Sequence, residues 1–481
     1  MQYHSTRGKS AAIDSAQAIL NGIAPDGGLY LPKIFPVFSW ENCVNAAPLE
    51  AASMILSAFF PDISEMPELV RRAYGEKFDT PELTPTVSVG AFSVLELFHG
   101  PTSAFKDVAL SMLPQLMTAA KAAAGMDEEI RILTATSGDT GKAALEGFRD
   151  VPGISICVFY PDGGVSDVQR RQMVSQEGNN VTVCAIRGNF DDAQTGVKNI
   201  FSACREKELP FRLSSANPIN IGRLVPQILY YFRAYRHLLD AGKIQMGDSV
   251  NFSVPTGNFG DILAGYLAKR LGLPVGKLLC ASNANNVLTD FIRTGTYDRR
   301  RPLHKTLSPS MDILVSSNLE RMLYLLSEDA ALVADLMEQL NQNGHYTVPN
   351  ALMTRIQELF YAGWCNDESG KDVIRRVWED HHYLCDTHTA SGWAVAEDYV
   401  NQTGDSRPMV VLSTASPYKF PAAVLSAIGG ATQGSEFDQM ESLQQLTNVP
   451  IPKNLADLRI KPERHTTVID KEDMLPFVLG L

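Results

Sequence analysis

The stretch "RILTATSGDTGKAALEGF", residues 131–148, runs from a β-branched apolar segment through a tight polar loop into an amphipathic segment. It predicts a strand, a turn and a helix, in that order. More short apolar runs of the same character follow, separated by amphipathic segments: "ISICVFY" (154–160), "NVTVCAI" (180–186), "SVNFSVP" (249–255) and "KLLCAS" (277–282). Because alternating strands and helices are typical of parallel sheets covered by helices, the sequence predicts an α/β fold.

The rest of the chain divides by composition. Residues 1–90 carry Pro and Gly punctuation at "APDGGLYLP" and a helical run at "PLEAASMILSAFF", so we expect a separate N-terminal unit there. The main region is predicted over 91–425, with a helical insertion at about 319–380 in which no strand is expected. The stretch after Phe420 is rich in Gln, Asn, Asp and Pro, and we expect 426–481 to form a loop-rich C-terminal extension.

Composition narrows the class of protein. A chain of 481 residues with 45% hydrophobic and 20% charged residues has the balance of an ordinary globular protein. Its net charge of -12 disfavours a broad surface that follows nucleic-acid phosphates. We therefore predict that any anion it handles is small and enclosed.

Cysteine usage and hydropathy bear on the compartment. The seven cysteines form no C-x-x-C pair or tight Cys/His spacing, so reduced thiols and no metal site are predicted. The N-terminus lacks the apolar core of a signal peptide. Since no apolar run approaches the roughly 18 residues of a membrane helix, we predict a cytoplasmic protein without membrane contact.

One lysine follows a turn and opens an apolar run, in "ELFHGPTSAFKDVALSM", residues 96–112. If the helix opens near Phe105, the ammonium of Lys106 lies close to the positive end of the helix dipole, which favours the neutral amine. A neutral amine is the nucleophile that a Schiff-base lysine requires. On its position alone, the favoured interpretation of Lys106 is an ordinary surface lysine in a first helical turn.

Two further loops lead from a predicted strand into a helix. The loop with Ser137, Gly138, Asp139 and Thr140 points backbone N–H groups at the site of an anion, or is an ordinary capped helix start. A nucleotide-binding P-loop is disfavoured, because the spacing would need glycine at 136 and Ser or Thr at 143.

The second loop, in "VPTGNFGDILAGYLAKRLG", has the residues of a phosphate cup: Gly257, Asn258, Phe259, Gly260 and Asp261. Together with the first loop it suggests a phosphate-bearing cofactor in one loop and an anionic substrate in the other. A last candidate, Thr414 in "MVVLSTASPYKF", follows a strand and is either a cap or a hydrogen-bond partner of a heterocyclic nitrogen.

The motifs "YHSTRG", "HGPTSAFKD", "TSGDTGKAA", "SSANPINIGRL", "PTGNFGD" and "SPSMDILVSSNLERML" stand in the order found in threonine synthases. The chain resembles this family of type II, tryptophan-synthase-β-like pyridoxal phosphate enzymes over about residues 1–420. The resemblance implies the type II fold, with two αβα subdomains. It also implies pyridoxal 5'-phosphate as cofactor and lyase activity on O-phospho-L-homoserine, giving L-threonine and phosphate.

The resemblance also implies roles for residues. Lys106 resembles the lysine bonded to the cofactor, residues 257–261 the cup for its phosphate, and Thr414 the hydroxyl beside its pyridine nitrogen. Residues 137–140 resemble the substrate loop. Asn217 and Arg223 resemble residues near the substrate phosphate, and Arg223 is the expected clamp because guanidinium pairs bidentately with phosphate.

Some positions depart from the family pattern: Pro218, Thr387, Ser391 and Ser416. They leave the substrate contacts open more than the cofactor contacts. A phospho-lyase that releases a keto acid, and a non-catalytic anion-binding relative, therefore remain alternatives. The assembly is expected to be a monomer or a homodimer.

Overall fold

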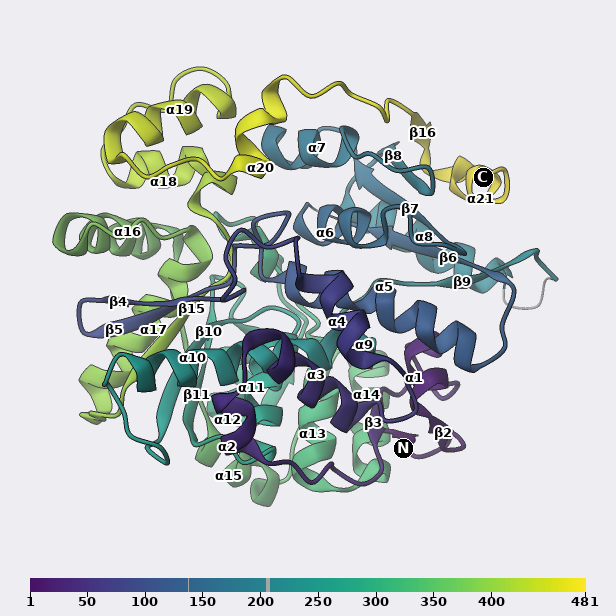
Figure 1. Cartoon of the computed structure of the whole chain (residues 1–481), viewed down its shortest axis with the longest axis horizontal. Helices are drawn as coiled ribbons and strands as arrows, with labels where there is room; N and C mark the ends of the chain where they lie inside the picture. The colour runs from purple at the N-terminus through teal and green to yellow at the C-terminus, as the bar shows by residue number, and fades with distance from the viewer. Residues whose placement is uncertain (137, 205–207) are drawn as a thin grey trace.

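Two mainly parallel sheets organise the chain in the computed structural model, which describes residues 1–136, 138–204 and 208–481 (Figure 1). The first has five parallel strands in the order β16-β8-β7-β6-β9. Their bounds are Glu129–Ala135 (β6), Ile154–Pro161 (β7), Val181–Arg187 (β8), Phe211–Ser214 (β9) and Val468–Asp470 (β16).

The second sheet has six strands in the order β14-β11-β10-β15-β5-β4, and only the pairing of β4 with β5 is antiparallel. The strands are Thr86–Val89 (β4), Phe92–Glu96 (β5), Val250–Pro255 (β10), Val275–Ser282 (β11), Phe360–Trp364 (β14) and Met409–Ser413 (β15). All five strands predicted from the apolar runs are confirmed, with β6, β7 and β8 in the first sheet and β10 and β11 in the second.

The alternation of side chains along the strands explains the layers. In β7, Val158 faces a central core between the sheets, whereas its neighbour Phe159 faces an outer core under α8 (Phe190–Cys204) and α21 (Met474–Leu479). In β15, Val410 faces the central core and Val411 an outer core under α16 (Asp367–His381) and α17 (Thr387–Thr403). Successive residues of a strand point to opposite faces of the sheet. Because helices cover both faces of each sheet, the strands must be apolar on both sides.

Helices fill the central core and bring the N-terminal residues into it. The core includes side chains of α5 (Lys106–Ala123), α6 (Asp139–Phe148), α10 (Ile228–Asp240) and α11 (Gly260–Arg270). It also includes α1 (Ser15–Asn21), α3 (Pro48–Phe59) and α4 (Met66–Tyr74), of which α4 lies beside α5 in Figure 1. Helices α1 and α4 of the N-terminal residues therefore pack on the helix that opens at Lys106.

The expectation that 319–380 lacks a strand is wrong. Helices α13 (Leu319–Ser327), α14 (Ala330–Asn343) and α15 (Asn350–Leu359) form as predicted, but β14 follows directly and pairs in parallel with β11 at the sheet edge. A second short strand, β13 (His345–Thr347), pairs with β12 (Thr296–Asp298). The five-residue run "FYAGW" directly continues the helical pattern of α15, and its partner β11 is 78 or more residues away. The sequence therefore has no local signal that distinguishes this strand from the helix before it.

The expectation of a loop-rich C-terminus is also wrong. This part contains α18 (Pro421–Ala427), α19 (Glu436–Thr447), α20 (Lys453–Ala456), α21 and the edge strand β16. Helix α19 begins at a capping box made by Ser435 and Asp438 and buries Met440 and Leu443. Its polar composition hides it, because only one narrow stripe of the helix meets the core.

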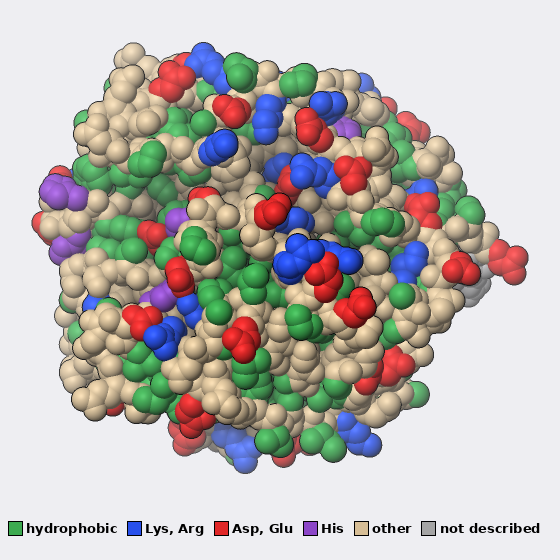
Figure 2. Space-filling model, viewed as in Figure 1, with side chains coloured by type: hydrophobic (Ala, Val, Ile, Leu, Met, Phe, Trp, Pro, Cys, Tyr) green, Lys and Arg blue, Asp and Glu red, His purple; other side chains and the backbone are tan. Residues whose placement is uncertain are grey.

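Charged and apolar side chains are mixed on the surface. Figure 2 shows acidic, basic and apolar side chains interspersed on one face of the molecule. Within the described ranges, no helix is long and apolar enough to cross a membrane.

Candidate active site

Lys106 is the first residue of α5, as predicted, and its side chain is almost fully buried at 9% exposure. The preceding turn is held by Asp107, whose carboxylate accepts hydrogen bonds from the N–H of Thr102 at 2.8 Å and from its hydroxyl at 2.5 Å. Burial raises the pKa of Asp107 to about 6. A hydrogen-bonded turn thus places the amine of Lys106 in the interior of the protein.

The amine of Lys106 has polar partners from two distant segments. Its Nζ lies 3.3 Å from the hydroxyl of Ser310, to which it donates a hydrogen bond, and 3.8 Å from Oδ2 of Asp139. Burial lowers the pKa of Lys106; Asp139 and Asp261 oppose this shift, while Lys419 and Arg223 add to it. The environment therefore favours the neutral amine that nucleophilic or base chemistry needs.

Asp139 joins two buried lysines. Its carboxylate pairs with Nζ of Lys419 at 2.7 Å, faces Lys106 on its other oxygen, and accepts a hydrogen bond from Gln169 at 3.0 Å. Although burial opposes ionisation, the two lysines hold the pKa of Asp139 well below its usual range. The single negative charge of Asp139 can therefore balance only one of the two lysines, Lys106 or Lys419, when both are protonated.

The loop before α11 also has the predicted form. Phe259 adopts a left-handed conformation at φ 62°, which turns the chain into the helix start at Gly260. The carbonyl of Gly257 accepts from the hydroxyl of Ser316 at 2.8 Å, and that of Asn258 accepts from the N–H of Asn318 at 3.0 Å. The loop is therefore braced by the segment that leads into α13.

Two details of this loop suit an anion. A Cβ at Gly257 would lie 2.7 Å from the carbonyl oxygen of Ser310, so only glycine permits this close approach of two backbones. Burial raises the pKa of Asp261 to about 7, with Lys106 opposing the shift. Near neutral pH, Asp261 is therefore protonated in a large fraction of molecules and repels an anion less.

Thr414 and Lys106 are connected through the backbone. Thr414 follows β15 and is buried, and its carbonyl accepts a hydrogen bond from the N–H of Phe105 at 2.9 Å. A bridge between Ala104 and Ala415 continues this contact. The strand end and the start of α5 therefore form one edge of the site.

The two residues expected at the substrate phosphate differ in their surroundings. Arg223 is buried in α9 (Ile221–Leu224), its Nη1 donates to the carbonyl of Ala216 at 2.6 Å, and its charge acts on Lys106. Burial lowers the pKa of Arg223 to about 10, which leaves it a cation at neutral pH. Asn217 is exposed, and the neighbouring Asn220 caps α9.

Gly138 precedes α6 at φ 144°, where a Cβ would meet the side-chain amide of Gln169 at 2.4 Å. Thr140 is half-buried in the first turn of α6. Ser137 lies outside the described residues. The loop as described thus contributes Asp139 as its main charged group.

Ser310 and Lys419 contact the site, but neither residue has a predicted role from the sequence. Ser310 is itself held by a buried pair: its N–H donates to Nε2 of His388 at 3.2 Å, and Nδ1 of His388 lies 2.6 Å from Asp386. Because Nε2 accepts, the proton of a neutral His388 is on Nδ1, facing Asp386. The only signal in the sequence was that Ser310 and Lys419 stand inside stretches that were considered for other residues.

The positions that depart from the family pattern have structural partners. Ser416 caps the turn Pro417–Lys419 by accepting from the N–H of Tyr418. Thr387 donates to the carbonyl of Leu307 at 2.7 Å, and Ser391 donates to that of Thr387 at 3.4 Å. The carbonyl of Pro218 accepts from Nδ2 of Asn318 at 3.0 Å.

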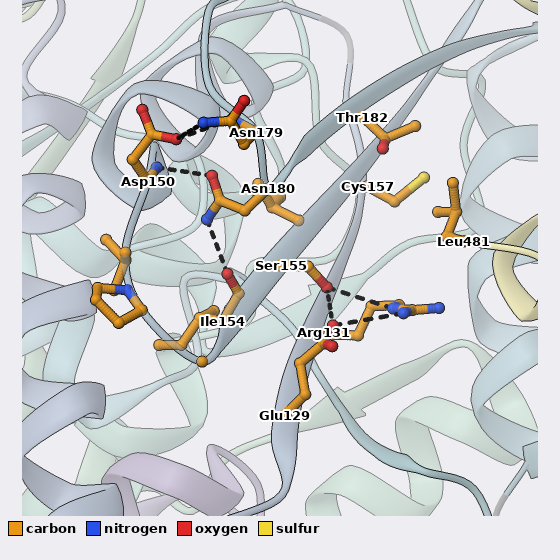
Figure 3. A pocket seen from close by; sticks show the side chains of 14 residues that line it. Glu129, Arg131, Asp150, Ile154, Ser155, Cys157, Asn179, Asn180, Thr182 and Leu481 are labelled. Atoms are coloured by element: carbon orange, nitrogen blue, oxygen red, sulfur yellow. Dashed lines mark hydrogen bonds and ion pairs between the residues drawn. The ribbon is translucent and has the colours of Figure 1, made fainter.

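A hollow of about 650 Å³ lies away from Lys106, at the amino ends of β6, β7 and β8 (Figure 3). Its polar side chains bond mainly to one another and to the backbone: Ser155 to Glu129 at 2.5 Å, and Asn180 to the carbonyls of Phe148 and Ile154, both at 2.8 Å. Thr414 instead directly follows the carboxyl end of β15, and Lys106 and Asp139 begin the helices that come after β5 and β6. This is the edge where sites of open α/β sheets gather.

Comparison with protein-family models gives three consecutive matches. These are "Threonine synthase N terminus" over residues 2–74, "Pyridoxal-phosphate dependent enzyme" over residues 78–415, and "Threonine synthase, C-terminal" over residues 389–475. Together they account for most of the chain.

Individual proteins agree with these models. Threonine synthase of Pseudomonas aeruginosa is 39% identical over 480 residues, covering 97% of this chain and 96% of that protein. Human "Threonine synthase-like 1" is 39% identical over 434 residues, but this chain spans only 58% of its length. The crystal structure of pyridoxal-phosphate-bound threonine synthase from Brucella melitensis superposes with a TM-score of 0.88 at 39% identity, covering 100% of this chain and 98% of that one.

Proposed function

The chain belongs to the threonine synthase family of pyridoxal-phosphate-dependent enzymes, and we propose that it converts O-phospho-L-homoserine and water to L-threonine and phosphate. The observation that carries the proposal is the buried amine of Lys106, held between Ser310 and Asp139. It stands beside two strand-to-helix loops and the cation of Arg223. Cytoplasmic location and a monomeric or homodimeric state stay predictions.

The residues of the site fit the cofactor. The close backbone approach at Gly257 and the start of α11 give a cradle of N–H groups for its phosphate, in residues 257–261. The raised pKa of Asp261 removes part of the repulsion that a second anion would meet there. Lys106 would bond to the cofactor, and Thr414 would offer a neutral hydroxyl to its ring nitrogen.

When bound, pyridoxal phosphate withdraws electrons and so stabilises negative charge at the substrate carbon atoms where protons are removed. The chain supplies the proton movements. The Nζ of Lys106 would take the proton from Cα of the substrate and return it later, because burial lowers the pKa of this amine and so favours its neutral form. Ser310 orients Nζ by the hydrogen bond of 3.3 Å.

Loss of phosphate from Cγ places a doubly charged leaving group in the site. Arg223 would receive it, because a guanidinium pairs bidentately with phosphate and remains protonated with a pKa of about 10. Asn217 and residues 137–140 would contact the rest of the substrate. Water addition at Cβ then gives the β-hydroxy amino acid.

The test is a visible absorption spectrum of the purified protein, followed by addition of O-phospho-L-homoserine and identification of the amino acid formed. A cofactor band with release of threonine and phosphate is the expected result. A cofactor band with a keto acid as product would identify a phospho-lyase instead. The absence of a band after pyridoxal phosphate is supplied would point to a non-catalytic relative.

A further inference from the structure

The turn that precedes Lys106 is held by residues from the other end of the chain. Residues 100–103 form a tight turn in which Ser103 has a left-handed backbone at φ 58°, a conformation that a non-glycine residue adopts only when its surroundings impose it. The N–H of Ser103 donates to the carbonyl of Gly100 at 3.1 Å. Lys106 begins α5 three residues later, so the geometry of this turn sets where its amine points.

Asn454 uses both ends of its side-chain amide on this turn. Its Nδ2 donates to the carbonyl of Pro101 at 2.8 Å and to that of Gly100 at 3.3 Å. Its Oδ1 accepts from the hydroxyl of Ser103 at 3.0 Å. A single side chain therefore satisfies three groups of the turn, across 351 or more residues of sequence.

The backbone of Asn454 is anchored independently of these contacts. It belongs to α20, whose Leu455 is fully buried, and Leu458 directly after the helix is buried in the same outer core as α18 and α19. In Figure 1, α20 lies at the top of the molecule beside α7 (Asp167–Val174), where the C-terminal segment passes over the first sheet. Asn454 is thus presented to the turn by a packed segment.

We propose that Asn454 is a positioning residue of the active site, which fixes the turn at residues 100–103 and thereby the direction of the Lys106 amine. This role of Asn454 rests on the proposed function in one respect only, namely that the amine of Lys106 is the group that reacts. It also gives the C-terminal extension a role in the reaction, since this extension supplies no group that touches Lys106 itself among the described residues.

The test compares Asn454→Ala with Lys453→Ala, which removes an exposed side chain from the same helix. In cofactor-free protein, we expect hydrogen exchange of the peptide over residues 97–112 to be about tenfold faster in Asn454→Ala, because the turn opens locally. Lys453→Ala should exchange like the wild type. Asn454→Asp has the same size and keeps the acceptor for Ser103, but it loses both donated hydrogen bonds. It should show the same faster exchange, and it takes the place of Asn454→Ala where the alanine variant folds poorly.

Two rates then separate positioning from mere structural support. The rate at which added pyridoxal phosphate bonds to Lys106, followed by absorbance, and kcat should each fall about tenfold with KM nearly unchanged, as expected for a misplaced reacting group. Faster exchange with wild-type rates would overturn the positioning role, as would unchanged exchange. The bonding rate uses no substrate, so it tests Asn454 even if the proposed reaction proves wrong.

Discussion

Replacing Lys419 by methionine tests how the charges of the site lower the pKa of Lys106. Lys419 is completely buried, and its Nζ lies 2.7 Å from Asp139 and 3.0 Å from the carbonyl of Thr102. Methionine has a similar length and no charge, so the change removes a cation while filling the space. Asp139 is then left with Lys106, at 3.8 Å, as its remaining cationic partner.

The sign of the effect follows from the charges that face Lys106. Burial, Lys419 and Arg223 lower its pKa, while Asp139 and Asp261 raise it. Removing Lys419 withdraws one lowering influence and strengthens the pairing with Asp139, so the pKa of Lys106 rises. A like charge disfavours the charged form much as an opposite charge favours it, by about one to three units at close range, so losing Lys419 should raise the pKa of Lys106 by about one unit.

The consequence is measured in the pH dependence of kcat in the cofactor-loaded enzyme. The limb that reports loss of the neutral amine at low pH should move about one unit to higher pH, because one unit is a tenfold change in the amine's proton affinity. Below that limb the rate should be about tenfold lower, and it should recover on raising the pH.

Lys419→Arg keeps the charge and is the control, which should leave the limb in place. Removing one partner of a buried ion pair also costs about 3–5 kcal/mol of stability, so thermal unfolding is recorded in parallel. A folded Lys419→Met variant whose low-pH limb coincides with that of the wild type would refute the reasoning.

The remaining predictions use single substitutions. Lys106→Ala should abolish turnover and the covalent cofactor band while leaving the melting temperature nearly unchanged, and residual turnover would remove Lys106 from its role. Arg223→Ala should raise KM for the phosphorylated substrate about a hundredfold with little change in cofactor absorbance, because a charge-assisted bidentate contact is lost; an unaltered KM speaks against the clamp. Asp261→Asn should stabilise the protein as pH rises. The folded pKa of Asp261, about 7, lies above its unfolded value of 3.8, so ionisation disfavours the folded state. The gain, measured by denaturant unfolding, should grow from pH 4 to a limit of about 4 kcal/mol above pH 7 and be absent below pH 4.

The elements that could be predicted from the sequence are those with local signals. The apolar runs of β6 and β7 are β-branched and bounded by polar turns, and the turn before Lys106 is rich in Gly, Pro, Thr and Ser. Strand β14 was missed because its pattern continues that of α15, and its strand character comes from pairing with β11. Helix α19 was missed because its apolar stripe is narrow.

The missed site residues lie far from Lys106 in the sequence. Ser310 is 204 residues from Lys106, and Lys419 reaches the turn across 317 residues. A buried lysine and a serine have no local pattern that distinguishes them from surface residues until the sheets bring them together. The glycine-rich loops were found because backbone N–H groups act locally, whereas a charge network exists only in the folded chain.

The charge network around Lys106 supports its proposed role as the reacting group. The amine of Lys106 and the cations Lys419 and Arg223 are all buried. Asp139 is the carboxylate that faces both lysines and is held ionised, whereas Asp261, with a pKa of about 7, is only partly ionised near neutral pH. Buried positive charge in excess of its counter-ions is costly, because desolvation is not repaid by pairing. The cost falls when Lys106 loses its proton, and it falls again when an anion enters. In the proposed reaction, the same imbalance would favour the neutral amine and the binding of a substrate and a cofactor that both carry phosphate.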